Sequence, residues 1–241
     1  MKRKNKKIKA NPPKWKICTE GVTEANYLYE YAKLLGIDKY IRINCKNKKD
    51  SGCGLQHEKL FDKMQNCLKN TIVYEKTFLV HDYDKAAEQK EAKISFNNTF
   101  KRANDDANFH VIYSNPCIEY WLMLHLAYND SDLHRSNFQE MVKNVCNRKR
   151  EEQRLEPLHD DKFKTDPCIF CYFGGKCGSN QARKHALKRF NISNHKKIIN
   201  KSFSSECYSI KAPYTNMFEL LDELDQYAKK FVQHNKFTGS D

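Results

Sequence analysis

The sequence lacks any long apolar run. No stretch of about 18 apolar residues occurs, so we expect no membrane-spanning helix. The basic N-terminal residues are not followed by an apolar segment, so we expect no secretory signal peptide. A Gly-x-Ser-x-Gly motif is also missing, which leaves a serine-hydrolase function without support. The chain has no internal repeat.

Acidic residues are scarce relative to basic ones. The 241 residues include 43 Lys and Arg but only 30 Asp and Glu, which gives a formal net charge of +13. A surface with this bias attracts polyanions, so nucleic acid is the first candidate partner and an acidic membrane the second. Residues 1–16 contain eight Lys or Arg. We expect them to form a flexible basic arm until something anionic binds.

The chain has ten cysteines in 241 residues, whereas an extracellular disulfide scaffold is usually shorter and denser in cysteine. Cys18, Cys117 and Cys146 lie in apolar or periodic stretches, where a thiol behaves as a small hydrophobic side chain. We therefore expect free thiols and a cytoplasmic location.

A second group of cysteines has part of the spacing of a zinc site. Cys168 and Cys171 form a Cys-x₂-Cys pair, and Cys177 follows. His159 or His185 could supply a fourth ligand. Because the second paired half of a zinc motif is missing, we favour free or buried thiols in an irregular insert over a structural Zn²⁺ site.

Apolar periodicity predicts strands and helices in strict alternation over the first half of the chain. In chain order, the expected elements are a strand at 15–18, a helix at 24–35, a strand at 40–45, a helix at 57–70, a strand at 77–80, a helix at 85–102, a strand at 109–113 and a helix at 118–126. This order indicates an α/β fold with a mostly parallel sheet flanked by helices. Residues 17–130 would form this core.

Residues 131–241 have a different character and predict a C-terminal helical extension packed on the core. The expected helices of the extension lie at 136–154, 182–190, 193–200 and 217–231, and residues 157–178 are expected to be irregular. The last of these helices has the clearest apolar stripe in the chain.

Three acids follow two of the predicted strands. Glu20 comes directly after the first strand, and Asp82 and Asp84 come after the third. Ligands of open parallel sheets bind beyond the carboxyl ends of the strands, so we expect these acids to share one edge. Neighbouring carboxylates repel unless a cation lies between them, and Mg²⁺ needs only one or two of them. The bland alternative is a solvated loop, with Thr23 as a helix N-cap.

Four segments together resemble the RloB family, whose core is similar to the Toprim domain of topoisomerases, primases and OLD-type nucleases. These segments are Ile17-Cys-Thr-Glu-Gly-Val-Thr-Glu-Ala-Asn-Tyr27, Val80-His-Asp-Tyr-Asp84, Ser114-Asn-Pro-Cys-Ile-Glu-Tyr-Trp-Leu122 and Pro213-Tyr-Thr-Asn-Met217. They occur in the family's order over nearly the whole chain.

The resemblance implies a Toprim-like active site that uses Mg²⁺ or Mn²⁺ for phosphodiester chemistry. Glu20, Asp82 and Asp84 match the family's metal-binding acids, and Glu119 matches the acid in the helix after the fourth strand. Two positions depart from the pattern: His81 replaces an apolar or aromatic residue, and Lys85 stands where an acid is frequent. The second departure leaves the number of metal ions open.

The residues also allow other interpretations of these positions. An acid in the first helical turn, as at Glu119, also complements the helix dipole. Trp121 and Tyr120 are more simply core residues than a platform for bases. Ser114 and Asn115 have turn chemistry before a proline, which we favour over a phosphate contact.

A basic surface is expected on the helix at 182–190. Arg183, Lys184, Lys188 and Arg189 are close together there. A solvated helix face is the alternative, but the net charge favours a surface that follows a phosphate backbone.

The sequence therefore predicts a Toprim-type, metal-dependent nuclease that cleaves RNA such as tRNA, or DNA. RloB-like proteins occur beside ATPases in phage-defence loci, which implies a defence role and an ATPase partner. The alternative is a non-catalytic nucleic-acid-binding or regulatory subunit of such a complex. A homo-oligomer is left open.

Overall fold

The computed structural model describes residues 12–45, 62, 73–83, 90–105, 108–192 and 213–233. In chain order its elements are β1 Trp15–Thr19, α1 Val22–Leu34, β2 Ile41–Cys45, β3 Lys76–Asp82, α4 Lys90–Asn104, β4 Phe109–Asn115, α5 Ile118–Leu124, α6 Arg135–Glu152, the 3₁₀ helix η2 Asp160–Thr165, α7 Ile169–Tyr172, α8 Gly175–Ile192, β5 Tyr214–Thr215, α9 Met217–Ala228 and the π-helical turn η5 Lys229–Gln233. This alternation confirms the predicted α/β class.

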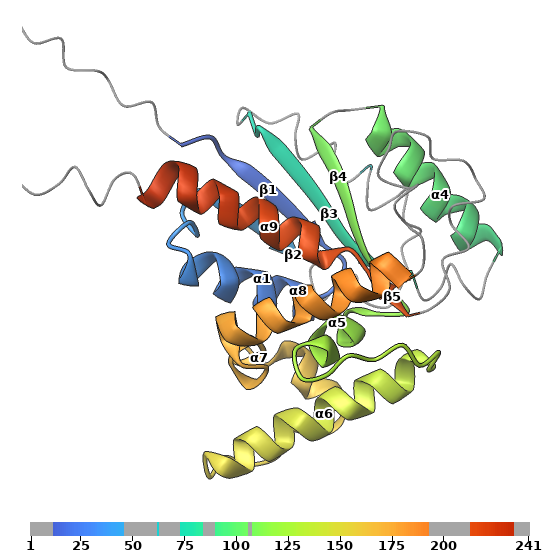
Figure 1. Cartoon of the computed structure of the whole chain (residues 1–241), viewed down its shortest axis with the longest axis vertical. Helices are drawn as coiled ribbons and strands as arrows, with labels where there is room; N and C mark the ends of the chain where they lie inside the picture. The colour runs from blue at the N-terminus through green and yellow to red at the C-terminus, as the bar shows by residue number, and fades with distance from the viewer. Residues whose placement is uncertain are drawn as a thin grey trace, which may run out of the picture.

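The sheet has five described strands in the order β2-β1-β3-β4-β5 (Figure 1). The first four are parallel, and β5 pairs with β4 in the antiparallel direction. The prediction of a mostly parallel sheet flanked by helices is therefore confirmed. The extension contains mostly helices, as predicted, and also contributes β5, which pairs with β4 in the sheet.

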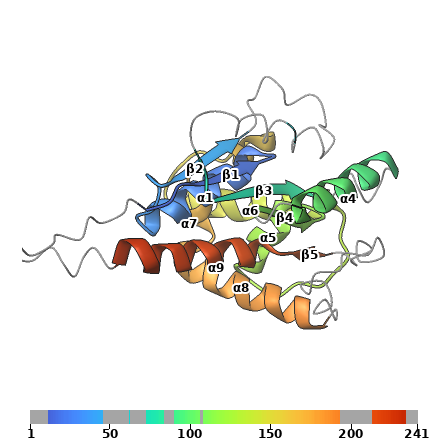
Figure 2. The same ribbon diagram turned by 90° about the horizontal axis from the view of Figure 1, so that it is seen from above.

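The two faces of the sheet are covered by different helices. Trp15 of β1 packs against Phe78 of β3, with ring centroids 5.6 Å apart, and against Tyr227 of α9, at 4.7 Å. On the other face, the ring centroids of His81 of β3 and Phe96 of α4 are 5.0 Å apart. Figure 2 shows α8 and α9 side by side and α4 apart from them. Side chains alternate along a strand, so Asp82 shares the face of Phe78.

One hydrophobic core joins the α/β unit and the extension. It includes the aromatic residues of α1 and α5 together with side chains from α6, α7, α8 and α9. Trp121 and Tyr120 are fully buried within it, which confirms their interpretation as core residues. Cys18, Cys117 and Cys146 are also buried, and Cys117 and Cys146 are free thiols. Among the described residues, no helix is both long and apolar enough to cross a membrane.

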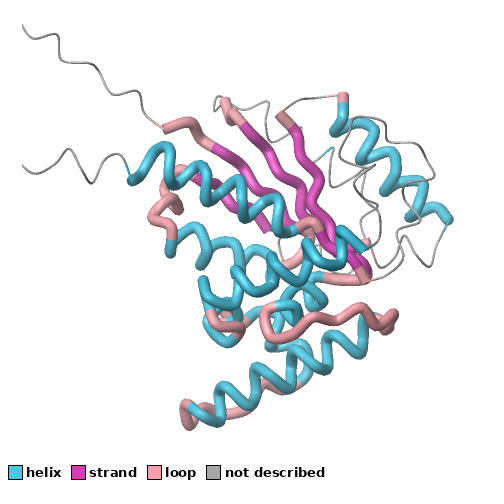
Figure 3. Tube along the Cα trace, in the orientation of Figure 1, coloured by secondary structure: helices cyan, strands magenta, loops and turns pink. Residues whose placement is uncertain are grey.

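Several predicted boundaries in the extension shift. Residues 157–178 are less irregular than expected, because they contain η2, α7 and the first turn of α8. Helix α8 begins at Gly175, seven positions before the predicted start at Ala182. Figure 3 shows the loop that connects α5 to α6. The helices predicted at 57–70 and 193–200, and most of the basic arm, fall outside the described residues apart from 62 and the last residues of the arm.

Candidate active site

Glu20 and Asp82 meet at the carboxyl ends of β1 and β3. The backbone amide of Glu20 donates to the carbonyl of Val80 at 2.9 Å, which extends the pairing of the two strands by one residue. The backbone amide of Asp82 in turn donates to Oε2 of Glu20 at 3.3 Å. The Glu20 side chain therefore points toward the end of β3, as the sequence predicts. Asp84 lies outside the described residues.

Glu119 reaches the same edge from α5. This helix begins at Ile118, after the N-cap residue Cys117, so Glu119 is in its first turn. The residue is 2% exposed, and burial is the main reason that its pKa is raised above the ordinary value. A hydrogen bond from the Cys117 side chain acts in the opposite direction. The helix dipole and the Cys117 thiol therefore support this acid in a buried place.

A fourth acid, Glu24, was missed by the sequence analysis. It lies in the first turn of α1 and is 3% exposed. Burial raises its pKa to about 8, and repulsion from Glu20 and Glu119 contributes to that rise. The signal was present in the sequence, because Glu24 is the second acid of the Glu-Gly-Val-Thr-Glu segment. Glu20, Glu24, Asp82 and Glu119 are together called the carboxylate site below.

In the carboxylate site, several acids are buried close together, and some of their oxygens have no hydrogen-bond partner. Burial raises the pKa of Asp82 well above its ordinary value, and the carboxylates of Glu24 and Glu119 raise it further. Asp82 Oδ1 and Glu119 Oε2 are buried and accept no hydrogen bond. Buried carboxylate oxygens of this kind are expected to take a proton or to bind a cation.

Two basic side chains of the extension act on the site. Arg135, the first residue of α6, lowers the pKa of Asp82, and Lys164 of η2 lowers that of Glu119. Thr23 connects η2 to α1, because its hydroxyl donates to the carbonyl of Lys164 at 3.1 Å. Nothing in the sequence indicates that Arg135 and Lys164 lie near the acids. The alternative interpretation, in which Thr23 is the N-cap of this helix, was wrong, because the N-cap residue of α1 is Gly21.

The donor atoms fit a hard divalent cation in their chemistry, since unsatisfied carboxylate oxygens are the ligands that Mg²⁺ and Mn²⁺ prefer. Within the described part of the chain, no group of three or more His, Cys, Asp or Glu side chains is arranged as a metal site. Glu20 and Asp82 are the described residues that would hold such an ion. The position of Asp84 is not described.

Ser114 and Asn115 belong to β4 and not to a turn after it. The hydroxyl of Ser114 lies 3.0 Å from that of Thr215, and both residues are buried. The Ser114 hydroxyl thus fastens β5 to β4. The peptide between Asn115 and Pro116 is cis.

The predicted basic surface on α8 divides into two parts. Arg183 donates to Asp225 at 2.9 Å and to the Tyr31 hydroxyl at 2.6 Å, and its Nε lies 3.2 Å from Asp222. Its guanidinium therefore fastens α8 to α9 and α1. Nε of Arg189 donates to the carbonyl of Pro213 at 3.1 Å.

Lys184 and Lys188 are the exposed part of that surface. Lys188 Nζ lies 4.2 Å from the centroid of the Tyr128 ring. Of the four cations predicted to bind nucleic acid, these two are the ones that remain on the outside of α8.

The described cysteines of the extension form no zinc cluster with the neighbouring histidines. Cys168, Cys171 and Cys177 are exposed and free. His185 is engaged elsewhere, since its Nδ1 lies 2.7 Å from the carbonyl oxygen of Leu124.

A comparison with protein families matches residues 16–224 to the model described as RloB-like protein. Comparison with curated proteins and with solved structures gives no match. The matched range covers most of the chain and contains all four acids of the carboxylate site. The chain therefore belongs to the RloB-like family.

Proposed function

We propose that this protein is a metal-dependent nuclease that hydrolyses phosphodiester bonds in RNA, such as tRNA, or in DNA. The observation that supports the proposal most is the meeting of Glu20 and Asp82 at the carboxyl ends of adjacent parallel strands. Ligand sites of open α/β sheets lie at such an edge. The buried, unsatisfied oxygens of Asp82 and Glu119 give this edge an affinity for positive charge.

Glu20 and Asp82 would hold Mg²⁺ or Mn²⁺, with Asp84 as a further ligand that the family resemblance implies. When bound, such a cation supplies positive charge to the phosphate and makes a water molecule a better nucleophile. Glu119, held by the dipole of α5, would orient that water by accepting a hydrogen bond from it. Lys164 and Arg135 flank the acids and would attract the phosphate of the substrate.

The role in phage defence and the ATPase partner are part of the same proposal. They depend on membership of the RloB-like family and on the resemblance in the four sequence motifs. A nuclease of this kind must be restrained in a healthy cell, so an ATPase partner is a reasonable source of its activation.

A cleavage assay tests the proposal. The purified chain is incubated with tRNA, plasmid DNA and single-stranded oligonucleotides in Mg²⁺, in Mn²⁺ and in EDTA. Asp82→Asn and Glu20→Gln remove one charge each from the site, while Asp132→Asn and Glu140→Gln remove the same charge from exposed positions. We expect cleavage in metal, no cleavage in EDTA and loss of activity only in the first two variants.

Two outcomes would count against the nuclease. Cleavage that survives Asp82→Asn would remove the proposed mechanism. Salt-sensitive binding without cleavage of any substrate, also when an ATPase partner is added, would favour the alternative of a non-catalytic nucleic-acid-binding or regulatory subunit.

A further inference from the structure

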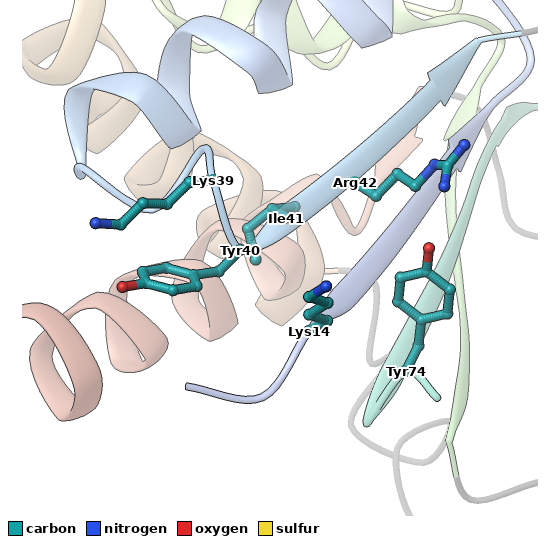
Figure 4. Close-up of a pocket in the computed structure, with 6 residues that line it drawn as sticks. All are labelled: Lys14, Lys39, Tyr40, Ile41, Arg42 and Tyr74. Carbon is teal, nitrogen blue, oxygen red and sulfur yellow. The ribbon is translucent and has the colours of Figure 1, made fainter. Parts of the chain in front are cut away.

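A small pocket lies at the opposite edge of the sheet from the carboxylate site. It opens where β1, β2 and β3 begin, and its volume is about 180 Å³. The lining residues are Lys14, Lys39, Tyr40, Ile41, Arg42 and Tyr74. Figure 4 shows Arg42 and Tyr74 on one side of Lys14, and Lys39 and Tyr40 on the other. We call it the amino-edge pocket.

Backbone hydrogen bonds hold the wall of the amino-edge pocket in place. The amide of Trp15 donates to the carbonyl of Tyr40 at 3.1 Å, and the amide of Glu75 donates to the carbonyl of Lys14 at 2.9 Å. These bonds connect the three segments that precede the strands. The pocket is therefore built on the rigid sheet, which reduces the entropy lost when a ligand binds.

The charge in the amino-edge pocket is entirely positive. Lys14, Lys39 and Arg42 are exposed, and no acid is among the lining residues. Two acids adjoin lining residues in the sequence: the exposed Asp38 precedes Lys39, and Glu75 follows Tyr74. The Glu75 carboxylate accepts a hydrogen bond from Nε1 of Trp15 at 2.9 Å. Three exposed cations around one pocket, with no acid among its lining residues, favour an anion such as a phosphate backbone.

Two tyrosines give the amino-edge pocket an aromatic component. Tyr40 and Tyr74 are both half-buried, so each ring is supported by the fold and still partly accessible. Cations already lie against both rings: Lys39 Nζ is 5.0 Å from the Tyr40 centroid and Lys16 Nζ is 5.6 Å from that of Tyr74. Phosphate-binding cations beside aromatic rings are the combination that single-stranded nucleic acid requires.

The volume of the amino-edge pocket indicates whether it binds a whole small molecule or one unit of a polymer. Sites for whole small-molecule ligands usually measure roughly 300–1,000 Å³. The amino-edge pocket, at about 180 Å³, is smaller than that range. It has room for one unit of a longer molecule whose remaining contacts lie elsewhere.

We propose that the amino-edge pocket binds one nucleotide of a single-stranded nucleic acid, with Lys14, Lys39 and Arg42 at the phosphates on either side of that nucleotide and a tyrosine ring under its base. The inference shares with the proposed function only the assumption that the ligand is nucleic acid. Lys14 and Glu20 are six residues apart along extended chain, which corresponds to about 20 Å. A strand of several nucleotides would span that distance and reach both edges.

Binding measurements in EDTA test the proposal without any need for cleavage. Fluorescence anisotropy of a labelled single-stranded oligonucleotide is compared for the full chain and for Lys39→Gln/Arg42→Gln. The double variant Lys93→Gln/Lys101→Gln removes the same charge from exposed positions of α4 and is the matched control. We expect at least a tenfold loss of affinity for the pocket variant only. Its salt dependence, as log K against log[salt], should become shallower by about 0.7 for each lost phosphate contact.

Two tyrosine variants test whether bases stack on the aromatic rings of the amino-edge pocket. Tyr74→Leu should weaken binding of the single strand about tenfold and leave binding of a duplex nearly unchanged, because paired bases cannot stack on the ring. Tyr29→Leu, at a tyrosine that is 50% exposed on α1, should change neither.

Three results would overturn the inference. Equal losses in the pocket and control double variants would show that only the overall charge matters. A larger loss in Lys184→Gln/Lys188→Gln would place the nucleic acid on α8 instead. Binding of an acidic peptide with the same sensitivity to the pocket variants would indicate a protein partner.

Because the binding assay contains no metal, its outcome is independent of the nuclease proposal. Failure of this inference leaves the nuclease proposal standing. Pocket-dependent binding without any cleavage would contradict only the nuclease proposal.

Discussion

The backbone amide of Asp82 donates a 3.3 Å hydrogen bond to Oε2 of Glu20, although the two residues are 62 positions apart in the chain. This contact joins the ends of two adjacent parallel strands through the side chain of one acid. It keeps Glu20 turned toward β3 in spite of the negative charges there. The carboxylate site is therefore a place where the fold holds like charges together, and its variants should reveal that repulsion.

Glu24→Gln should stabilise the metal-free protein at alkaline pH. The pKa of Glu24 is 4.5 in the unfolded chain and about 8 in the folded protein. Between these values the folded state holds a proton that the unfolded state has lost, so stability falls as pH rises through this window. The variant lacks this titration. In urea unfolding in EDTA, the gain in unfolding free energy over the unmodified chain should be about 1 kcal/mol at pH 5 and on the order of 4 kcal/mol at pH 8.

Glu30→Gln, at a partly exposed residue of the same helix, is the control for Glu24→Gln. It should have nearly the same stability as the unmodified chain at both pH values. Equal effects of the two variants would mean that Glu24 is not buried among other carboxylates.

Gly21→Ala should disturb the carboxylate site by a purely steric effect. The backbone of Gly21 is extended, with φ of −116°, so alanine causes no backbone strain there. A Cβ at this position would collide with the carboxylate of Glu24. We expect a loss of about 1–3 kcal/mol, typical of an overpacked site. Denaturant unfolding measures it.

The double variant Gly21→Ala/Glu24→Ala tests whether the stability lost in Gly21→Ala comes from the collision with Glu24. Shortening Glu24 removes the clash, so the cost of Gly21→Ala should nearly vanish in that background. If the two costs simply add, Glu24 does not lie against Gly21.

The strands and the main helices could be predicted because their patterns are local. The apolar run Thr77-Phe-Leu-Val80 indicates a buried strand by itself, and the stripe of α9 needs no information from elsewhere. The shared edge of Glu20 and Asp82 followed from strand direction alone. β5 escaped prediction because two residues are too short for any periodicity.

The missed parts of the site depend on contacts between distant segments. Thr23 binds the carbonyl of Lys164, 141 residues away, and nothing in either segment indicates the other. Arg183 looked like a surface residue because its neighbours in α8 are basic. Its partner Asp225 is 42 residues further along the chain, in α9, so burial of this cation could not be read from local sequence.

Arg183→Gln should therefore cost stability. The Arg183 side chain is 13% exposed and that of Asp225 is 19% exposed, so the variant leaves a half-buried carboxylate without its partner. Asp222 is 50% exposed and should contribute little. We expect a loss of about 2 kcal/mol in urea unfolding. Lys184→Gln, at the next position, should change stability by less than about 0.5 kcal/mol.

A double variant tests whether Arg183 stabilises the fold through its ion pair with Asp225. In a background of Asp225→Asn, the further cost of Arg183→Gln should fall clearly below its cost alone, because the pair is already broken. An unchanged cost would contradict a structural role. So would a loss of nucleic-acid binding by Arg183→Gln without any loss of stability.

The most direct test of the account is a Mn²⁺ titration followed by electron paramagnetic resonance, in which the signal of free Mn²⁺ disappears on binding. We predict that the unmodified chain and Asp132→Asn bind Mn²⁺, that Asp82→Asn and Glu20→Gln lose this binding, and that binding releases protons near neutral pH because the pKa values of Asp82 and Glu119 are raised. The account would be contradicted if Mn²⁺ bound equally well to all four proteins or to none of them.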